Sequence, residues 1–196
     1  MHKSPGLTAI GILLGGASRR MGCPKHAVVL PDGRTLLDAM IDLAAPLCDN
    51  IMLCGEGDCN HMLPRVHDAP GAHGPLAGIE ALLRTVTEGR CMVLPCDMPA
   101  LEVTDLRRLA TTEAPLALFA AETTSKMRSM PLLIDAKLLP ALRDSIESGQ
   151  CALHAFIQSQ PHELIAPPTD TATLMNLNTP EDLARWVSSQ DGSHEQ

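Results

Sequence analysis

The chain has 196 residues, enough for one domain with a substantial core, and 45% of them are hydrophobic although only 2% are aromatic. A formal net charge of −8 excludes a general nucleic-acid-binding surface, so any anionic ligand has to be held by a local group of cations. No stretch is apolar enough to span a membrane, and seven cysteines without a disulfide framework indicate a cytoplasmic protein.

The first predicted element is a buried strand, residues 7–14, which breaks abruptly into two glycines. Because the apolar run is short and a basic segment follows at once, we interpret it as a strand and not as a signal peptide. Glycines directly after a strand allow backbone N–H groups to approach an anion closely. Arg19, Arg20 and Lys25 add positive charge to the same loop, which therefore predicts a polyphosphate site.

The spacing of this loop excludes two better-known phosphate loops. The P-loop requires G-x-x-x-x-G-K-[ST], but five residues separate Gly16 from Gly22, and Cys23 follows. The dinucleotide-binding motif G-x-G-x-x-G does not occur after the strand either. A surface loop with scattered basic residues is the simpler alternative. The surface-loop interpretation is less well supported than a phosphate site, because many phosphate-binding features fall within a few residues.

A helix and a second strand follow the loop. Thr35 is expected to cap a helix whose apolar residues recur at helical spacing as far as Leu47, and residues 51–54 form a second buried strand. This order predicts a parallel strand pair joined by a right-handed crossover. The spacing of Cys59 and His61 from the end of the second strand matches no standard zinc finger, so we expect incidental thiols there.

The next segment is a weak extended piece that stops at Asp68, followed by a stretch rich in glycine and proline. A helix is predicted to start at Pro75 and to end near Gly89. We expect its N-terminal amides to face the same sheet edge as the first loop, where they favour a bound anion. Asp68 itself is either a ligand of the nucleotide or a turn residue.

Asp97 follows the predicted strand 91–94 and is flanked by Pro95 and Pro99. An aspartate just past the carboxyl end of a central strand lies where open α/β sheets bind ligands. A helix cap or a turn is the simpler interpretation of a single aspartate. The flanking prolines and the phosphate loop at the same edge favour a metal ligand.

The rest of the chain alternates between helices and strands and ends in a capped helix. We expect Trp186 to pack that helix onto the sheet, after a last short strand over residues 174–178. Residues 1–188 therefore form a single three-layer α/β/α domain with a mostly parallel, Rossmann-like sheet, and residues 189–196 a flexible polar tail. The remaining predicted elements are helices 103–112, 138–148 and 152–158, strands 116–121 and 130–134, a polar loop 122–129 and an edge strand 162–166.

Four separated stretches resemble the molybdenum cofactor guanylyltransferases, the family of molybdopterin-guanine dinucleotide biosynthesis protein A. The first fits L-x-G-G-x-S-x-R-M-G-x-x-K position by position, and the four stretches are 13–25, Asp68 with 74–78, 95–99 and 176–182. The resemblance implies a fold of the nucleotide-diphospho-sugar transferase type. It also implies transfer of GMP from GTP to the terminal phosphate of molybdopterin, with release of pyrophosphate.

The same resemblance implies the ligands and the residues that contact them. GTP and molybdopterin are the implied substrates, with other molybdenum cofactor biosynthesis proteins and acceptor apo-enzymes as further partners. Mg²⁺ is the implied cofactor, held by Asp97. The expected catalytic residues are Arg19, Arg20, Lys25 and Asp97. The expected nucleotide contacts are Leu13, Leu14, Gly15, Gly16, Lys25, Asp68, Gly74 and Asp97. Cys54 departs from the pattern, since relatives often have an asparagine there.

Three other functions stay open on the sequence. Transfer of CMP to molybdopterin and nucleotidyl transfer to a sugar phosphate belong to the same reaction class, but the loop glycines and residues 74–78 resemble the GTP-using form. A non-catalytic adaptor that only carries the cofactor is the third. Lys25 and Asp97 argue against it, because a passive carrier needs no metal at the α-phosphate.

Overall fold

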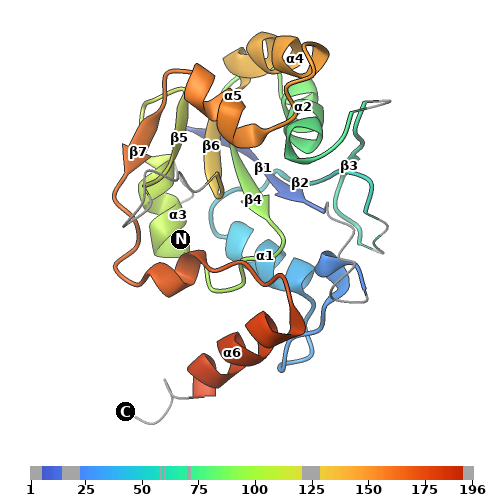
Figure 1. Ribbon diagram of the computed structural model, residues 1–196, viewed down its shortest axis with the longest axis vertical. Helices are drawn as coiled ribbons and strands as arrows, with labels where there is room; N and C mark the ends of the chain where they lie inside the picture. The colour runs from blue at the N-terminus through green and yellow to red at the C-terminus, as the bar shows by residue number, and fades with distance from the viewer. Residues whose placement is uncertain are drawn as a thin grey trace.

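The computed structural model describes residues 6–14, 23–57, 59, 61–69, 72–120 and 129–191. Strands of these residues form one seven-stranded sheet in the order β3-β2-β1-β4-β6-β5-β7 (Figure 1). Strand β6 is antiparallel to both β4 and β5, and every other pair is parallel. The strands are β1 (Leu7–Leu13), β2 (Ile51–Cys54), β3 (Arg65–Val66), β4 (Arg90–Pro95), β5 (Leu116–Phe119), β6 (Leu132–Asp135) and β7 (Glu163–Ile165).

Helices cover both faces of the sheet, which confirms the predicted α/β/α layers. On one face, α1 and α3 pack in a cluster that includes Ile10 and Ile12 of β1. On the other face, α2, α4 and α5 pack in a cluster with Ala9. The α-helices are α1 (Leu36–Ala44), α2 (Pro75–Thr85), α3 (Val103–Ala110), α4 (Leu139–Glu147), α5 (Leu153–Ser159) and α6 (Pro180–Asp191). Short 3-10 helices are η1 (Lys25–Ala27), η2 (Ala136–Leu138) and η3 (Thr171–Leu174).

Two glycines allow α2 to approach β1 closely. A Cβ atom on Gly11 would lie 2.6 Å from Cδ2 of Leu82, and a Cβ atom on Gly78 would lie 2.8 Å from Cδ2 of Leu13. Both distances are too short for real side-chain contacts, so a larger residue at either position would displace the leucine side chain that it meets. The first turns of α2 are thereby held against the carboxyl end of β1.

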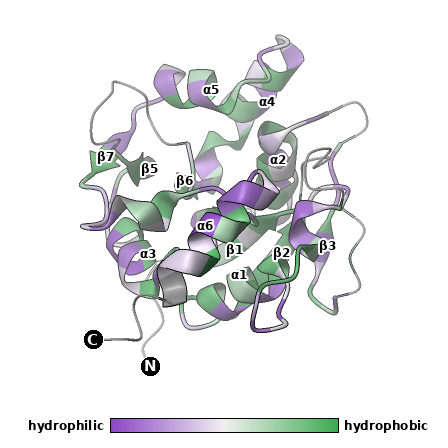
Figure 2. Cartoon of the chain, turned by 60° about the horizontal axis from the view of Figure 1, so that its bottom comes forward, coloured by the Kyte–Doolittle hydropathy of each residue, from purple (hydrophilic) through white to green (hydrophobic). Residues whose placement is uncertain are grey.

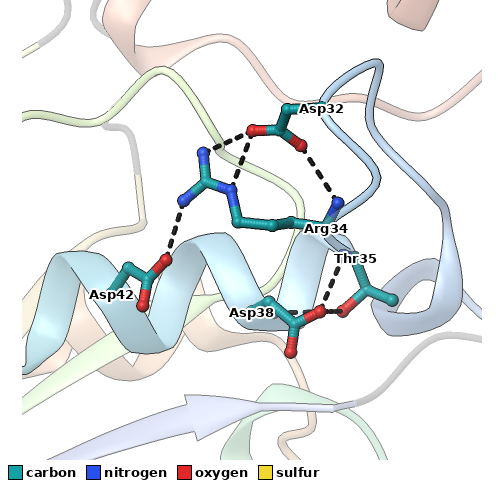
Figure 3. A network of polar contacts seen from close by, with 5 residues as sticks. All are labelled: Asp32, Arg34, Thr35, Asp38 and Asp42. Atoms are coloured by element: carbon teal, nitrogen blue, oxygen red, sulfur yellow. Dashed lines mark hydrogen bonds and ion pairs between the residues drawn. The ribbon is translucent and has the colours of Figure 1, made fainter.

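The start of α1 is fixed by a network of polar side chains (Figure 3). Thr35 and Asp38 form a capping box, in which the Thr35 amide donates to Oδ2 of Asp38 at 2.8 Å and the Asp38 amide donates to the Thr35 hydroxyl at 3.1 Å. The Arg34 guanidinium donates to Asp32 at 2.8 Å and to Asp42 at 2.7 Å. The turn before the helix is therefore tied to α1.

The predicted strand over residues 174–178 is wrong. The chain there forms the end of η3 and then an extended segment that joins no sheet, because its backbone bonds elsewhere: the Leu177 amide donates to the Asp97 carbonyl at 2.8 Å. Leu174 and Leu177 are both buried, but in different clusters. A short segment with buried apolar residues therefore resembled a strand, although it has no partner in the sheet.

The last helix differs from the prediction in two ways. Helix α6 runs to Asp191, so residues 189–191, expected in the tail, are helical. Trp186 packs with Leu177 and residues of the loop before α1, and not on the sheet. Figure 2 shows α6 with both hydrophilic and hydrophobic residues, which agrees with one packed and one exposed side. Across the described parts of the chain, the helices lack the length and apolarity that crossing a bilayer requires.

Candidate active site

Lys25, Asp97 and Asn178 meet at the carboxyl edge of the sheet, although they are far apart in the sequence. The Lys25 ammonium donates to Oδ2 of Asp97 at 2.5 Å and to Oδ1 of Asn178 at 2.5 Å. Asp97 follows β4, whose last residue, Pro95, is paired in register with Leu13 at the end of β1. The cation expected to bind phosphate and the carboxylate expected to bind metal therefore occupy one place.

Several contacts hold Asp97 in place. The residue is only 6% exposed, and its backbone carbonyl accepts a hydrogen bond from the Leu177 amide. The ion pair with Lys25 is the shortest contact of its carboxylate. The Asn176 side-chain nitrogen lies 3.5 Å from both carboxylate oxygens. A carboxylate fixed in this way loses little conformational freedom when it binds a ligand.

The two asparagines were not among the predicted site residues. In an extended segment, successive side chains point to opposite sides, so residues i and i+2 share a side. Leu177 is fully buried, and Asn176 and Asn178 both reach the Lys25–Asp97 pair. The pattern Asn-Leu-Asn after a buried stretch was the signal that could have identified them.

Asp68 lies at the same edge of the sheet, on the other side of β1. It follows β3, and its Oδ1 atom is buried without a hydrogen-bond partner among the described residues. Burial, with a smaller contribution from the Glu56 carboxylate, raises the pKa of Asp68 above its usual value. The carboxylate therefore offers an acceptor atom to an N–H or O–H group of a ligand.

The start of α2 is shaped by Gly74, which lies at the N-cap with φ +79° and ψ −170°. This region of backbone conformation is essentially restricted to glycine. No heavy atom lies within 4 Å of the position that a Cβ atom on Gly74 would take. Pro75 occupies the first turn as expected. It has no N–H and the Ala77 amide donates to the Gly74 carbonyl at 3.1 Å, so the Leu76 amide is the donor that this turn offers to an anion.

Leu13 ends β1 and Leu14 follows it beside these groups, and both side chains pack on the core. Leu14 is 2% exposed, and its amide already donates to the Cys54 carbonyl at 2.8 Å. Any ligand contact of Leu14 is thereby confined to its carbonyl group. Gly15, Gly16, Arg19 and Arg20 lie outside the described residues, so their expected phosphate contacts stay predictions.

The neighbouring cysteines belong to the core and not to the site. Burial raises the pKa of the Cys54 and Cys96 thiols to about 12, so both thiols are neutral at physiological pH. Cys54 is 1% exposed, and its Sγ atom fills the space next to Gly11. The Cys54 side chain is therefore not placed to replace an asparagine that contacts a nucleotide.

Among the residues that the structure describes, no three His, Cys, Asp or Glu side chains are grouped so that they could hold a metal ion. The donors that do converge are hard oxygens, the carboxylate of Asp97 and the carboxamide oxygen of Asn178. Mg²⁺ prefers oxygen ligands, and it commonly takes only one or two protein carboxylates and completes its shell with phosphate and water. This donor set fits Mg²⁺ bound together with a polyphosphate.

Comparison with known proteins identifies close relatives of most of the chain. Residues 10–164 match the model of the MobA-like NTP transferase domain, which ends before η3 and α6. A protein of Rhodopirellula baltica named "Probable molybdenum cofactor guanylyltransferase" is 30% identical over 190 residues, covering 89% of both chains. The molybdenum cofactor guanylyltransferase of Rhodopseudomonas palustris is 33% identical and covers 88% of this chain and 87% of its own.

A solved structure shares the fold. Molybdopterin-guanine dinucleotide biosynthesis protein A from Archaeoglobus fulgidus superposes with a TM-score of 0.78 at 19% identity. The superposition covers 93% of this chain and 100% of the archaeal chain. The nucleotide-diphospho-sugar transferase type of fold expected from the sequence is therefore confirmed.

Proposed function

Because this chain belongs to the family of MobA-like NTP transferase domains, and within it to the molybdenum cofactor guanylyltransferases, we propose that it transfers GMP from GTP to molybdopterin. The acceptor is the terminal phosphate of molybdopterin, and the products are molybdopterin guanine dinucleotide and pyrophosphate. The observation that carries the chemistry is the Lys25–Asp97 pair, which brings a cation for phosphate and a carboxylate for a divalent metal to one point.

The reaction joins two phosphates. An oxygen of the molybdopterin phosphate attacks the α-phosphorus of GTP, and the bond from that phosphorus to the bridging oxygen breaks as pyrophosphate leaves. The second pKa of a phosphate monoester is about 6, so the nucleophile is ionised at neutral pH and needs no general base. The main barrier is repulsion between the two anions, which positive charge and in-line positioning lower.

Lys25 supplies positive charge at a defined position. Its ammonium is held between Asp97 and Asn178 and is largely shielded from water, with 16% of its side chain exposed. An ammonium has three N–H donors, so it can keep a protein partner while it donates to a phosphate oxygen. We propose that Arg19 and Arg20, from the loop before it, contact the same triphosphate.

Asp97 is the proposed ligand of Mg²⁺, with Asn178 as the nearest further oxygen donor. Bound there, Mg²⁺ would supply positive charge that offsets the negative charge of the α-phosphate and of the leaving pyrophosphate. The backbone of Asp97 is fixed by β4 on one side and by the Leu177 amide on the other. The carboxylate therefore keeps its position while substrates enter and products leave.

The guanosine half of GTP is proposed to lie across the end of β1, between Asp68 and the first turn of α2. Three groups there can contact it: the Oδ1 atom of Asp68, the Leu76 amide at the start of α2, and the backbone of residues 13 and 14. Polar groups matched to one base remain unpaired with another base, which gives strong discrimination. We expect selection of GTP over CTP to depend on these groups.

The proposed function also implies protein partners and a cell compartment. Other molybdenum cofactor biosynthesis proteins and the apo-enzymes that receive the cofactor are the expected protein partners. We place the reaction in the cytoplasm. All seven cysteines lie in the described parts of the chain and are free thiols there, which fits a reducing compartment.

Pyrophosphate release with Mg²⁺, molybdopterin and one nucleotide at a time tests the function. GTP should give pyrophosphate and molybdopterin guanine dinucleotide, and CTP should give neither at a comparable rate. Product from CTP would identify a cytidylyltransferase instead. Turnover of GTP with a sugar phosphate but not with molybdopterin would identify a sugar-phosphate nucleotidyltransferase. Tight binding of molybdopterin without pyrophosphate release would identify the protein as a non-catalytic adaptor that carries the cofactor.

A further inference from the structure

A small apolar cluster joins the last helix to the loop that carries Lys25. It is separate from the two clusters that flank the sheet. Its buried members come from the loop, from the first residue of α1 and from the segment before α6, and α6 packs against them. We call this group the C-terminal cluster: Val28, Leu30, Leu36 and Leu177, with Ala39, Met175, Leu183 and Trp186 partly buried against them.

The loop from Lys25 to Leu36 is one hydrogen-bonded unit. The Val28 amide donates to the Lys25 carbonyl at 3.1 Å, and the Leu36 amide donates to the Val28 carbonyl at 2.9 Å. On one side this unit is anchored to α1 by the Arg34 network (Figure 3). On its other side it contacts α6 through the C-terminal cluster. A displacement of α6 therefore acts on the position of Lys25.

The start of α6 also fixes Asn178, the second acceptor of the Lys25 ammonium. The amides of Asn178 and Thr179 both donate to Oδ2 of Asp182 at 3.0 Å, and the Asp182 amide donates to the Thr179 hydroxyl at 3.2 Å. This is the geometry of a capping box. Asn178 therefore moves with the first turn of α6.

The far part of α6 is held to the rest of the protein by apolar packing. The indole Nε1 atom of Trp186 is buried and has no hydrogen-bond partner within the described residues. In Figure 1, α6 lies below α1, away from the sheet. An element with a small apolar contact and no place in the main core can detach without unfolding of the whole domain.

We propose that Trp186 is a positioning residue of the active site: by docking α6 on the C-terminal cluster, it holds Lys25 and Asn178 against Asp97. The inference rests on the proposed function, because it assigns these three groups to GTP and its metal. The coupling is reciprocal, so GTP with Mg²⁺ stabilises the docked state of α6. The family model ends at residue 164, so this role falls in a part of the chain that the model does not cover.

The test compares the wild-type chain with Trp186→Ala, Trp186→Phe and Ser188→Ala. Ser188 is exposed on the same helix, two residues away, and serves as the matched control. A displacement of reacting groups by about 1 Å can lower a rate roughly 100-fold, and we expect that order of loss in turnover for Trp186→Ala. Trp186→Phe keeps an aromatic ring in the cluster and should recover most of the rate. Ser188→Ala should match wild type.

Two further measurements separate positioning from general stability. Hydrogen exchange should show α6 amides less protected in Trp186→Ala while amides of β1 and β4 keep wild-type protection. The second measurement follows α6 in the wild-type protein. Addition of GTP with Mg²⁺ should slow hydrogen exchange of the α6 amides, because binding lowers the population of the undocked state.

The outcomes are distinguishable. Wild-type turnover by Trp186→Ala with unprotected α6 amides overturns the inference and leaves the proposed function intact. Loss of protection in β1 and β4 overturns it as well, since Trp186 would then act through global stability. A wild-type protein that binds GTP in calorimetry but whose α6 amides exchange no more slowly contradicts the coupling. A wild-type protein that does not bind GTP overturns the proposed function and this inference together.

Discussion

The Nζ atom of Lys25 lies 2.5 Å from Oδ2 of Asp97, so the cation expected to bind phosphate is paired with the carboxylate expected to bind metal. One carboxylate oxygen cannot contact an ammonium and a divalent cation equally well at the same time, because the two cations repel each other. The polyphosphate of an incoming nucleotide offers Lys25 a second anionic partner. Metal binding at Asp97 is therefore expected to depend on the nucleotide.

Lys25→Met should separate the two halves of this pair. Without the competing ammonium, Asp97 should bind Mn²⁺ in the absence of nucleotide roughly tenfold more tightly than in wild type. Electron paramagnetic resonance of free Mn²⁺ measures this directly, and kcat/KM for GTP should fall in the same variant. Lys137→Met, at an exposed position on η2, is the control and should change neither quantity. Unchanged Mn²⁺ affinity in Lys25→Met would place the metal away from Asp97.

Asp97→Asn should fold normally and lose turnover. The substitution keeps the shape of the side chain but removes the charge that holds the metal, so the rate should fall about 10²–10³-fold, the order seen when one electrostatic contact to a transition state is removed. Mg²⁺-dependent pyrophosphate release measures the loss, and calorimetry with GTP reports binding. Near-wild-type turnover at ordinary Mg²⁺ concentration would contradict the metal assignment.

Asp105→Asn is the matched control for that experiment. Asp105 is buried to a similar degree, at 8% exposure, and its carboxylate pairs with Arg108 on α3 instead of with Lys25. It should lower stability while leaving the turnover of the folded protein near wild type.

Gly74→Ala should cost both stability and nucleotide binding. The backbone conformation of Gly74 is strained for any residue with a Cβ atom, at a cost of about 1–3 kcal/mol. Relief of that strain would rotate the first amides of α2 away from the ligand. Chemical denaturation measures the first effect and GTP calorimetry the second.

Gly149→Ala is the control for Gly74→Ala, because Gly149 also has a positive φ, +83°, but follows α4. The free energy of unfolding should fall by about 1–2 kcal/mol. Its affinity for GTP should not change. Equal affinity for GTP in both variants would exclude the start of α2 from the binding site.

Asp68→Asn should increase stability at neutral pH. Burial raises the pKa of Asp68 in the folded state, so the folded protein holds this proton more tightly than the unfolded chain does. The ionised carboxylate therefore destabilises the fold above that pKa. The penalty shrinks as the pH falls through the raised pKa and vanishes below the unfolded value near 3.8.

Denaturation of wild type and Asp68→Asn across pH measures this difference. The curves should diverge as the pH rises above the unfolded value and stay apart at neutral pH. GTP affinity should fall in the variant, because a carboxylate acceptor is replaced by a carboxamide. A variant that is less stable than wild type at pH 7 would show that Asp68 is a structural turn residue.

The periodic parts of the sequence predicted the fold well. The parallel strands with their long apolar runs, the capping of α1 by Thr35 and the start of α2 at Pro75 all follow from local rules that the structure obeys. Asp97 was predictable as a candidate site residue because the end of a central strand in an open sheet faces ligands. These features depend on neighbours along the chain.

The rest depended on contacts between distant residues. Nothing local to Asn176 or Asn178 indicates Lys25 as a partner, since Asn178 lies 153 positions after Lys25 in the sequence. Trp186 was expected on the sheet because an aromatic residue on an amphipathic helix usually packs against the main core. In the structure, Trp186 instead packs on the C-terminal cluster beside α1. Apolar spacing identifies which side of a helix is buried but not which surface receives it.

The positions of Lys25, Asp97 and Asn178 along the chain determine the order in which the site residues are synthesised. A ribosome makes the chain from its N-terminus, and domains generally fold as units during or after synthesis. The last strand of the sheet, β7, ends at Ile165, before Asn178 has been made. A chain made only as far as Ile165 thus contains every strand of the sheet while its Lys25 still lacks one of the two oxygens that hold it. The strands of the sheet are therefore synthesised before the last residue of the site. Catalysis has to await the segment that joins β7 to α6.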